Sequence, residues 1–305
     1  MIILHNYPQS PVAEKVRVAL GIKGASWASV EIPRIPPKPN LVKLTGGYRR
    51  TPVMQIGADI WCDSQHIIRA IDANTDGPSL YPARAGLAEI VSRWADADGF
   101  PLAVKIVLGS AGDALPADFA EDRGRLYLGP DWAERLKAAN AELPHLAAQM
   151  RSWLGWLDGQ LADQPFLVGD APTAVDAQIY HMVWFVRGRW DQGPQFLSEF
   201  PNLERWEAAV RDLGHGAMTD MTPEAAIEAA KVDPVTPEGV APGDPQGWSV
   251  GDAVAVTPDV NGGEQAVEGR IHAADATGVA ILREDPHCGA LCVHFPRLGY
   301  RIDRA

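Results

Sequence analysis

Asp63 and Ser64 stand where a hairpin pattern gives way to a helical one, and they could hold a small polar ligand. The stretch from Arg50 to Ser64, RTPVMQIGADIWCDS, has two short apolar runs joined by a Gly-Ala-Asp turn, which predicts a β-hairpin. Isoleucines at helical spacing follow directly. The first turn of a helix leaves backbone N–H groups without helical partners, and the serine hydroxyl adds another polar group. We therefore predict the edge of a binding site here.

Ser10 is a second hydroxyl at a predicted helix start. Serine is a preferred N-cap, and Pro11 suits the first helical position. Apolar residues at helical spacing follow until Gly21 and Gly24 end the pattern. A hydroxyl in this place could stabilise an anion through a hydrogen bond and the helix dipole. Taken alone, however, the pattern favours a simple helix cap.

Cysteines and histidines near the C-terminus raise the question of a zinc site. His287 and Cys288 are adjacent, and Cys292 and His294 are two residues apart, so the second pair would share one face of a strand. Cysteine and histidine are the usual zinc ligands, but the chain lacks the Cys-x-x-Cys pair typical of structural zinc sites. We therefore predict no metal.

The predicted elements around these residues form an N-terminal α+β domain over residues 1–78. Apolar strands are predicted at residues 2–4 and 27–32, separated by the helix that follows Ser10. Residues 33–50, rich in Pro, Gly and basic residues, are predicted to be largely irregular, with a short helix possible around Leu41 and Val42. The hairpin and the helix from Ser64 complete a small mixed sheet covered by helices.

Residues 83–231 predict an all-helical bundle domain. Apolar residues recur there at a period near 3.6. Thr173 and Asp176 have the spacing of a capping box at the head of an apolar helix, with Asp replacing the usual Glu or Gln.

The last part of the chain predicts a linker and a small all-β module. Residues 232–248 are rich in Pro and Gly, as linkers are. Short apolar runs separated by turns over residues 249–305 predict a small, SH3-like barrel. The chain as a whole is therefore expected to be a multidomain α+β protein.

Composition narrows the class of function. The chain has 305 residues, 46% of them hydrophobic, and a net charge of −12, which argues against a nucleic-acid partner. No apolar run is long enough to predict a membrane span. Three cysteines give no disulfide framework, so we expect a reducing cytoplasm.

Three motifs in the expected order resemble the cytosolic glutathione transferases, over roughly residues 1–215. Ser10 to Arg17, SPVAEKVR, is similar to the active-site turn of the tau and omega classes. Thr51-Pro52 followed by Asp63-Ser64 is similar to the family's cis-proline and acid-serine pair. The segment from Gly169 to Asp176 is similar to the capping segment of its helical domain. The resemblance implies a thioredoxin-like domain, a helical domain and a homodimer.

The resemblance also implies a glutathione site. Ser10 matches the family's activating serine, which would hold the glutathione sulfur as a thiolate. The backbone of Thr51, before Pro52, would pair with the cysteinyl backbone of glutathione. Asp63 and Ser64 would bind its γ-glutamyl ammonium and carboxylate.

Other residues are assigned less directly by the same resemblance. Arg50, with Arg49 as second choice, could pair with the glycyl carboxylate. The second substrate would bind near Trp94, Asp98 and Phe100, for which a packing role is an equal alternative. Two further residues have their own alternatives. Tyr7 is a rival to Ser10 as activator and is grouped with the second-substrate pocket, and His66 is expected on the surface of its helix.

The implied function is conjugation of glutathione, the only cosubstrate, to a small electrophile, as in detoxification. One alternative is a non-catalytic scaffold that binds a protein partner through residues 249–305. Another is a glutathione-dependent isomerase or dehalogenase, which would use the same first-domain site.

Overall fold

The computed structural model describes residues 1–82, 85–260 and 262–305 of the chain. Residues 83 and 84, with which the predicted helical domain begins, lie outside this description. The described chain forms two units. The first comprises Met1–Ala13, Ser26–Ala70 and Ala217–Ala305, and the second comprises Glu14–Ala25 and Ile71–Gly216.

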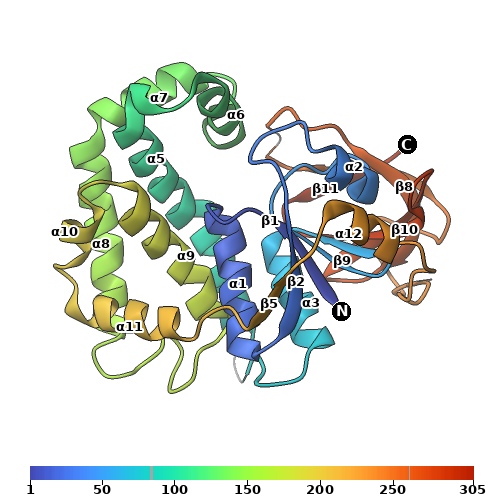
Figure 1. The fold of residues 1–305 in the computed structure, drawn as a ribbon, viewed down its shortest axis with the longest axis horizontal. Coiled ribbons are helices and arrows are strands. Elements are labelled where there is room, and N and C mark those ends of the chain that lie inside the picture. Colours follow the sequence, from blue (N-terminus) through green and yellow to red (C-terminus); the bar gives the residue numbers. More distant parts are fainter. Residues whose placement is uncertain (83–84, 261) are drawn as a thin grey trace. The chain divides into compact units, whose positions relative to one another are not determined.

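The elements of the first unit are labelled in Figure 1 where space allows. In chain order they are β1 (Ile2–Asn6), β2 (Ser26–Glu31), α2 (Pro39–Thr45), β3 (Val53–Ile56), β4 (Asp59–Cys62), β5 (Ala217–Asp220), α12 (Pro223–Ala229), β6 (Gly239–Val240), β7 (Ala253–Pro258), β8 (Val267–Ala274), β9 (Gly278–Asp285), β10 (Gly289–Pro296) and β11 (Tyr300–Arg304). Helices α1 (Pro11–Lys23) and α3 (Ser64–Asn74) have residues in both units.

The N-terminal strands form the mixed sheet that a thioredoxin-like domain requires. β1 lies between β2, to which it is parallel, and β3, to which it is antiparallel. All five of its residues are buried, which explains why its sequence is apolar at its start instead of alternating. The predicted hairpin is confirmed as β3 and β4, joined at Gly57, whose φ of +59° suits glycine.

The C-terminal strands continue this same sheet. β7, β8, β9 and β10 pair in antiparallel order, and β11 pairs with β7. β10 pairs with β4 in parallel, so the hydrogen-bonded order runs from β11 through β10 and β4 to β5. The predicted barrel is therefore an extension of the N-terminal sheet, because β10 pairs with β4 and not with β11.

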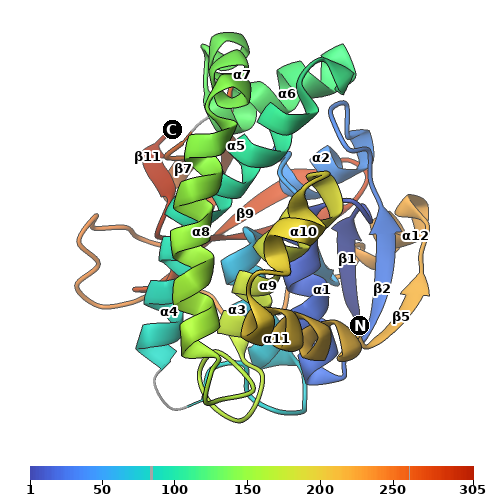
Figure 2. The same cartoon turned by 90° about the vertical axis from the view of Figure 1, so that its left-hand side faces the viewer.

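One apolar core serves both parts of the first unit. Val53, Ile60 and Cys62 from the N-terminal hairpin are buried in the same cluster as Ile281, Val293 and Phe295. Residues 232–248, predicted as a linker, include the short strand β6 and the buried Trp248. The chain also returns to the N-terminal sheet just after the helical region, where β5 pairs with β2, as Figures 1 and 2 show.

The second unit is helical, as predicted, but residues 217–231 of the predicted helical range belong to the first unit, because β5 pairs there with β2. Beyond its share of α1 and α3, its described helices are α4 (Ala85–Trp94), the π-helical turn η1 (Ala95–Gly99), α5 (Phe100–Ala111), the 3-10 turn η2 (Gly112–Ala114), α6 (Ala117–Leu128), α7 (Trp132–Ala141), α8 (Leu143–Gln160), α9 (Ala174–Arg189), α10 (Gly193–Leu197) and α11 (Pro201–Asp212). Helix α11 packs against α8 and α9 (Figure 2).

Helix α9 is the buried centre of this unit, and its predicted capping box is confirmed. The Thr173 hydroxyl accepts from the Val175 N–H, and Asp176 accepts from the backbone N–H of Thr173 at 2.8 Å. Asp176, fully buried, also accepts from the indole of Trp206 at 2.8 Å. The cap therefore fixes both the helix start and a second helix, α11.

Candidate glutathione site

The register of the N-terminal sheet brings the predicted site residues to one end of it. His5 near the end of β1 pairs with Val53 at the start of β3, and Val53 pairs with Cys62 at the end of β4. The segments leaving these positions are residues 7–10, 51–52 and 63–64. Because β1 and β3 are antiparallel, the end of one meets the start of the other. The structure therefore brings Ser10, Thr51-Pro52 and Asp63-Ser64 together at one end of the sheet, which is called the strand-end site below.

Ser10 caps helix α1 at the strand-end site. Its hydroxyl accepts a hydrogen bond from the Ala13 N–H at 3.1 Å, and its own N–H donates to the carbonyl of Tyr7 at 3.1 Å. The residue is 2% exposed. The serine oxygen therefore lies at the start of α1, bonded to a backbone N–H of its first turn.

Lys38 also lies at the strand-end site, although the sequence did not indicate it. Its ammonium donates to the Thr51 hydroxyl at 2.8 Å and to the carbonyl of Arg49 at 3.0 Å, and lies 5.9 Å from the centre of the Tyr7 ring. Lys38 is 4% exposed. The peptide bond between Thr51 and Pro52 is cis. In the sequence, Lys38 is one of several basic residues in the stretch predicted to be irregular, and nothing local marks it as buried.

Asp63 has an unusual backbone for a residue that is not glycine. Its φ is +73°, and no other non-glycine residue in the described part of the chain has a positive φ. Such a conformation costs of order 1 kcal/mol or more, and it recurs at functional sites. Its Oδ1 accepts from the Gln65 N–H at 2.9 Å, at the start of α3, and Ser64 beside it is 6% exposed.

Two tyrosines connect Asp63 to the C-terminal strands. The Asp63 N–H donates to the Tyr48 hydroxyl at 3.2 Å, and the Tyr300 hydroxyl donates to Asp63 Oδ2 at 3.3 Å. The two hydroxyls are 3.1 Å apart. Burial, with the nearby charge of Asp63, raises the pKa of both phenols well above the usual value. Both tyrosines therefore stay protonated and act as hydrogen-bond donors.

Arg50 is held by the C-terminal module. Its guanidinium donates to both carboxylate oxygens of Glu264, at 2.7 and 2.6 Å, and also to the carbonyl of Val260. The Glu264 side chain is 3% exposed. Burial lowers the pKa of Arg50, but the hydrogen bond and charge of Glu264 outweigh it and the net shift is upward. Arg49 donates more weakly, to the carbonyl of Gly262 at 3.4 Å.

The residues expected near a second substrate lie in the second unit, with three different environments. Trp94, half-buried at the end of α4, packs against Trp153 with ring centres 5.5 Å apart. Phe100 is 7% exposed and packs against His181 and Phe185. Asp98 is exposed. The two aromatic residues therefore contribute to packing within the bundle, which was the alternative prediction.

Asp96, between them, forms a polar centre that the sequence did not reveal. It accepts from the Lys15 ammonium at 2.7 and 2.9 Å and from the Gln178 amide at 2.6 Å. Lys15 is 1% exposed. The π-helical turn η1 places Asp96 inward, and this departure from regular helical spacing has no signal in the sequence.

A second polar cluster lies where the C-terminal module joins the N-terminal sheet. Asp59, Cys292 and His294 each offer one ligand atom within 4.8 Å of the others, and all three residues are buried. Hydrogen bonds from His294 and Thr236 outweigh burial and lower the pKa of Asp59. Burial and Asp59 raise the pKa of Cys292, so its side chain is a thiol and not a thiolate. His66, expected on the surface, is half-buried near this cluster, and burial lowers its pKa to about 4.

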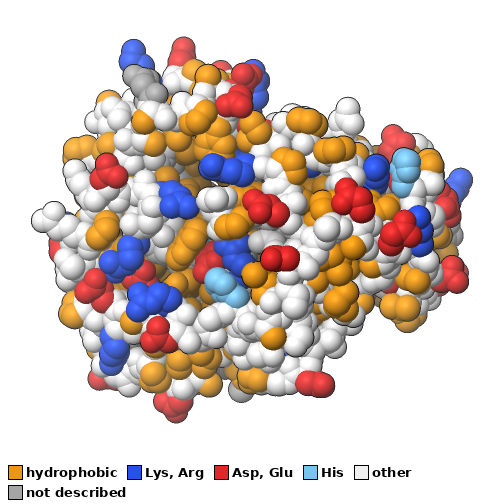
Figure 3. Space-filling view, in the orientation of Figure 1, with side chains coloured by type: hydrophobic (Ala, Val, Ile, Leu, Met, Phe, Trp, Pro, Cys, Tyr) orange, Lys and Arg blue, Asp and Glu red, His pale blue; other side chains and the backbone are white. Residues whose placement is uncertain are grey.

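Acidic and basic side chains are interspersed on the face shown in Figure 3. Together with the net charge of −12, this offers no basic surface there for a polyanion. Among the described residues, no helix combines the length and apolar character needed to cross a bilayer.

Comparisons with known proteins match the two parts of this fold. The family model of the glutathione S-transferase N-terminal domain matches residues 4–79, and that of the C-terminal domain matches residues 130–209. A GST-like protein from Pseudomonas syringae has 34% sequence identity and a TM-score of 0.81, with 100% of this chain and 99% of that chain covered. The match therefore includes the C-terminal strands. Curated proteins give no match.

More distant structures share the fold alone. Glutathione transferase F2 from Populus trichocarpa has 16% identity and a TM-score of 0.53, covering 76% of this chain and 99% of that one. The beta-etherase LigF from Sphingobium sp. strain SYK-6 has 15% identity and a TM-score of 0.51, covering 70% and 98%. Both family models and the similarity over the whole chain agree: the chain belongs to the glutathione S-transferase family.

Proposed function

We propose that the chain is a serine-type glutathione transferase that adds the glutathione thiolate to a small electrophile. The observation that carries the proposal is the convergence of Ser10, Thr51-Pro52 and Asp63-Ser64 at one end of the N-terminal sheet. Membership of the family supports the use of glutathione. The tau or omega type of the motif at Ser10 stays a prediction.

Ser10 would supply the activation of the sulfur. A free thiol has a pKa of about 8.5 and is mostly protonated at neutral pH. At the start of α1, the serine proton and the positive end of the helix would both favour the thiolate. The thiolate then attacks the electrophilic carbon, a C–S bond forms, and the leaving group departs with its electron pair or the adduct takes up a proton.

The ends of the tripeptide would be held by groups of both signs. Asp63 would accept from the γ-glutamyl ammonium, while Ser64 and the first N–H groups of α3 would bind the γ-glutamyl carboxylate. The ammonium of Lys38, which donates to the Thr51 hydroxyl, would pair with a second carboxylate of the tripeptide. Arg50 could also serve once it is released from Glu264.

The test is calorimetric glutathione binding, with the ultraviolet thiolate band followed against pH, for the wild type and Ser10→Ala. We expect a bound thiol with a pKa well below that of free glutathione, rising by about one to two pH units in the variant as one charge-assisted hydrogen bond is lost. Thr222→Ala is the matched control. Its hydroxyl caps α12 in the same unit, so it should cost about 1 kcal/mol of stability and leave the thiolate pKa unchanged.

One observation favours a non-catalytic scaffold as the second candidate. Arg50 and Asp63, both assigned to glutathione, are engaged by Glu264 and Tyr300 of the C-terminal module. A site committed to internal contacts would no longer bind the tripeptide. Absence of binding at millimolar glutathione would therefore replace the enzyme with the scaffold, in which residues 249–305 bind a protein partner.

The reaction type, the cellular compartment and the oligomeric state of the proposed enzyme need separate tests. Profiling with alkyl halides, epoxides and isomerisable substrates would separate a transferase from a dehalogenase or an isomerase. The three cysteines are free and buried, which supports a reducing cytoplasm. The homodimer and a role in detoxification stay predictions.

A further inference from the structure

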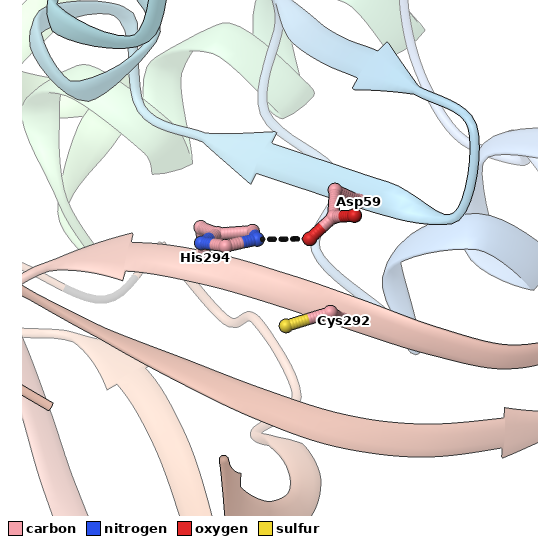
Figure 4. Close-up of side chains that lie close together, drawn as sticks. All are labelled: Asp59, Cys292 and His294. Carbon is pink, nitrogen blue, oxygen red and sulfur yellow. Dashed lines mark hydrogen bonds and ion pairs between the residues drawn. The ribbon is translucent and has the colours of Figure 1, made fainter. Parts of the chain in front are cut away.

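Asp59, Cys292 and His294 converge from two strands that the sequence separates by more than two hundred residues. The parallel pairing of β10 with β4 sets Cys292 opposite Asp59 and His294 opposite Trp61. Figure 4 shows the imidazole of His294 pointing to the Asp59 carboxylate, with the Cys292 sulfur beside them. We propose that these three side chains form a binding site for a zinc ion, which no part of the proposed transferase reaction requires.

The spacing of the ligand atoms suits an ion of this size. The three atoms lie within 4.8 Å of one another, and His294 Nε2 is 3.0 Å from Asp59 Oδ1. An ion centred among atoms 4.8 Å apart would lie about 2.8 Å from each, against the about 2.0–2.3 Å of zinc bonds. Inward shifts of about 0.5–0.8 Å at most would therefore close the site.

The donor types and their charges also favour zinc. A thiolate, an imidazole and a carboxylate together form a borderline-soft set that suits Zn²⁺ better than Mg²⁺ or Ca²⁺, which prefer oxygen. Asp59 and Cys292 are 0% exposed and His294 is 7% exposed. A dication with one carboxylate, one thiolate and one neutral imidazole carries no net charge, so the desolvation cost of burial is small. On binding, the thiol proton of Cys292 would leave to solvent.

Surrounding contacts hold these ligands in place. The Val235 N–H donates to Asp59 Oδ2 at 2.8 Å, and the Thr236 hydroxyl donates to Asp59 Oδ1 at 2.5 Å. The Trp61 indole stacks on the His294 ring, with centres 4.5 Å apart and planes 11° apart. In metal sites, contacts from surrounding groups of this kind orient the residues that bind the ion.

A cavity adjoins the cluster and gives the ion a fourth position. Its volume is about 200 Å³, and His294, Thr236 and His66 are among its lining residues. Three protein ligands with an open fourth position are typical of zinc sites that bind water or a substrate. A water molecule in this cavity would complete the coordination.

The test uses the full-length protein with zinc or cobalt as the only added probe. After gel filtration from zinc-containing buffer, we expect about one zinc per chain, and the Co²⁺ form should show a thiolate-to-cobalt absorption band. Cys292→Ser, which keeps a hydrogen-bond donor beside Asp59, should abolish the band and weaken zinc binding more than about tenfold. Cys288→Ser is the matched control, because Cys288 is a buried free thiol of the same module outside the cluster.

A measurement on the unaltered chain guards against a variant that fails to fold. Added zinc should raise the thermal midpoint of the wild type, and a chelator should reverse the shift. Absence of the cobalt band in the wild type would overturn the proposal, as would equal zinc content in Cys292→Ser and the wild type. Neither readout depends on glutathione, so the proposed function and this site are tested separately.

Discussion

His5 and His181 are buried histidines that the fold holds uncharged. His5 is 2% exposed and hydrogen-bonds to the Gln55 side chain at 2.9 Å, and burial lowers its pKa to about 4. His181 is 0% exposed, and burial with the nearby Lys15 lowers its pKa to about 3. Its Nδ1 lies 2.6 Å from the carbonyl of Gln178, and its Nε2 has no partner among the described residues.

These histidines should make the protein lose stability in mild acid. Unfolded histidine takes up a proton near pH 6.5, whereas the folded rings stay neutral until about pH 4 or below. Their contribution is therefore present above pH 6.5 and is lost as the pH falls toward the folded values. We expect His181→Leu to reduce the loss of unfolding free energy between pH 7 and pH 5 by about 2 kcal/mol, measured with urea.

The matched control for this change is His145→Gln. His145 lies exposed on α8, so its replacement should leave the pH dependence as it is in the wild type. If His181→Leu lost as much stability as the wild type between the two pH values, the ring would not be the neutral buried group described here.

For single residues, the sequence predicts the hydroxyls and carboxylates at helix starts but not the charged groups buried near them. Ser10 and Asp63 could be found because helix capping is local. Lys38 and Asp96 could not. The burial of Lys38 depends on how an irregular segment folds back on residues 49 and 51, and that of Asp96 depends on distant partners and a π-helical turn. Burial of a charged side chain is a property of the packing, and the local pattern does not contain it.

The segment between β7 and β8 determines whether the Arg50 guanidinium is available to a ligand. Glu264 in this segment pairs with Arg50 through two short hydrogen bonds. We expect Glu264→Gln to free the guanidinium for a carboxylate of glutathione and to tighten glutathione binding about three- to tenfold, as measured by calorimetry. The gain is modest because the Arg50 side chain is 28% exposed and partly screened by solvent.

Glu268→Gln is the matched control for this prediction. Glu268 is an exposed residue of β8 with the same side chain, and its replacement should leave glutathione affinity unchanged. An affinity that does not rise in Glu264→Gln would show that Arg50 only anchors the module. The thiolate measurement on Ser10 would be unaffected by that result.

Elements with strong local signals were predictable, and those formed by distant pairing were not. The hairpin of β3 and β4 and the capping box of α9 follow from turn and cap residues within a few positions. Strand β5 has four exposed residues and no alternation, so only its pairing with β2 defines it. The apolar runs of residues 249–305 predicted strands there, but not the pairing of β10 with β4.

In the first unit, the C-terminal strands complete the N-terminal domain. Val293 of β10 pairs with Ile60 of β4, and the two residues share one buried cluster. Tyr300 and Glu264 add polar contacts to Asp63 and Arg50. The Pro- and Gly-rich composition of residues 232–248 suggests an independent module, because composition reports local flexibility and not where the next segment docks.

Removal of residues 245–305 should therefore destabilise the glutathione site. The deletion would expose the edge of β4 and the apolar residues that β9 and β10 cover, and would remove the Tyr300 hydroxyl that hydrogen-bonds to Asp63. We expect the shortened chain to aggregate or to melt more than about 10 °C lower, and to lose glutathione binding. Thermal unfolding and calorimetry of both chains measure these effects.

Deletion of Ala305 alone is the control, because this exposed residue adds only one backbone hydrogen bond, to Ala253. It should keep both the melting temperature and the affinity. A stable shortened chain that still binds glutathione would show that the module is an accessory to the first domain and is not needed for the site. If the shortened chain instead lost both its thermal stability and its glutathione affinity, the C-terminal strands would be required for the glutathione site. They pair with the N-terminal sheet and share its buried core, so their removal would disturb the strands that carry the site.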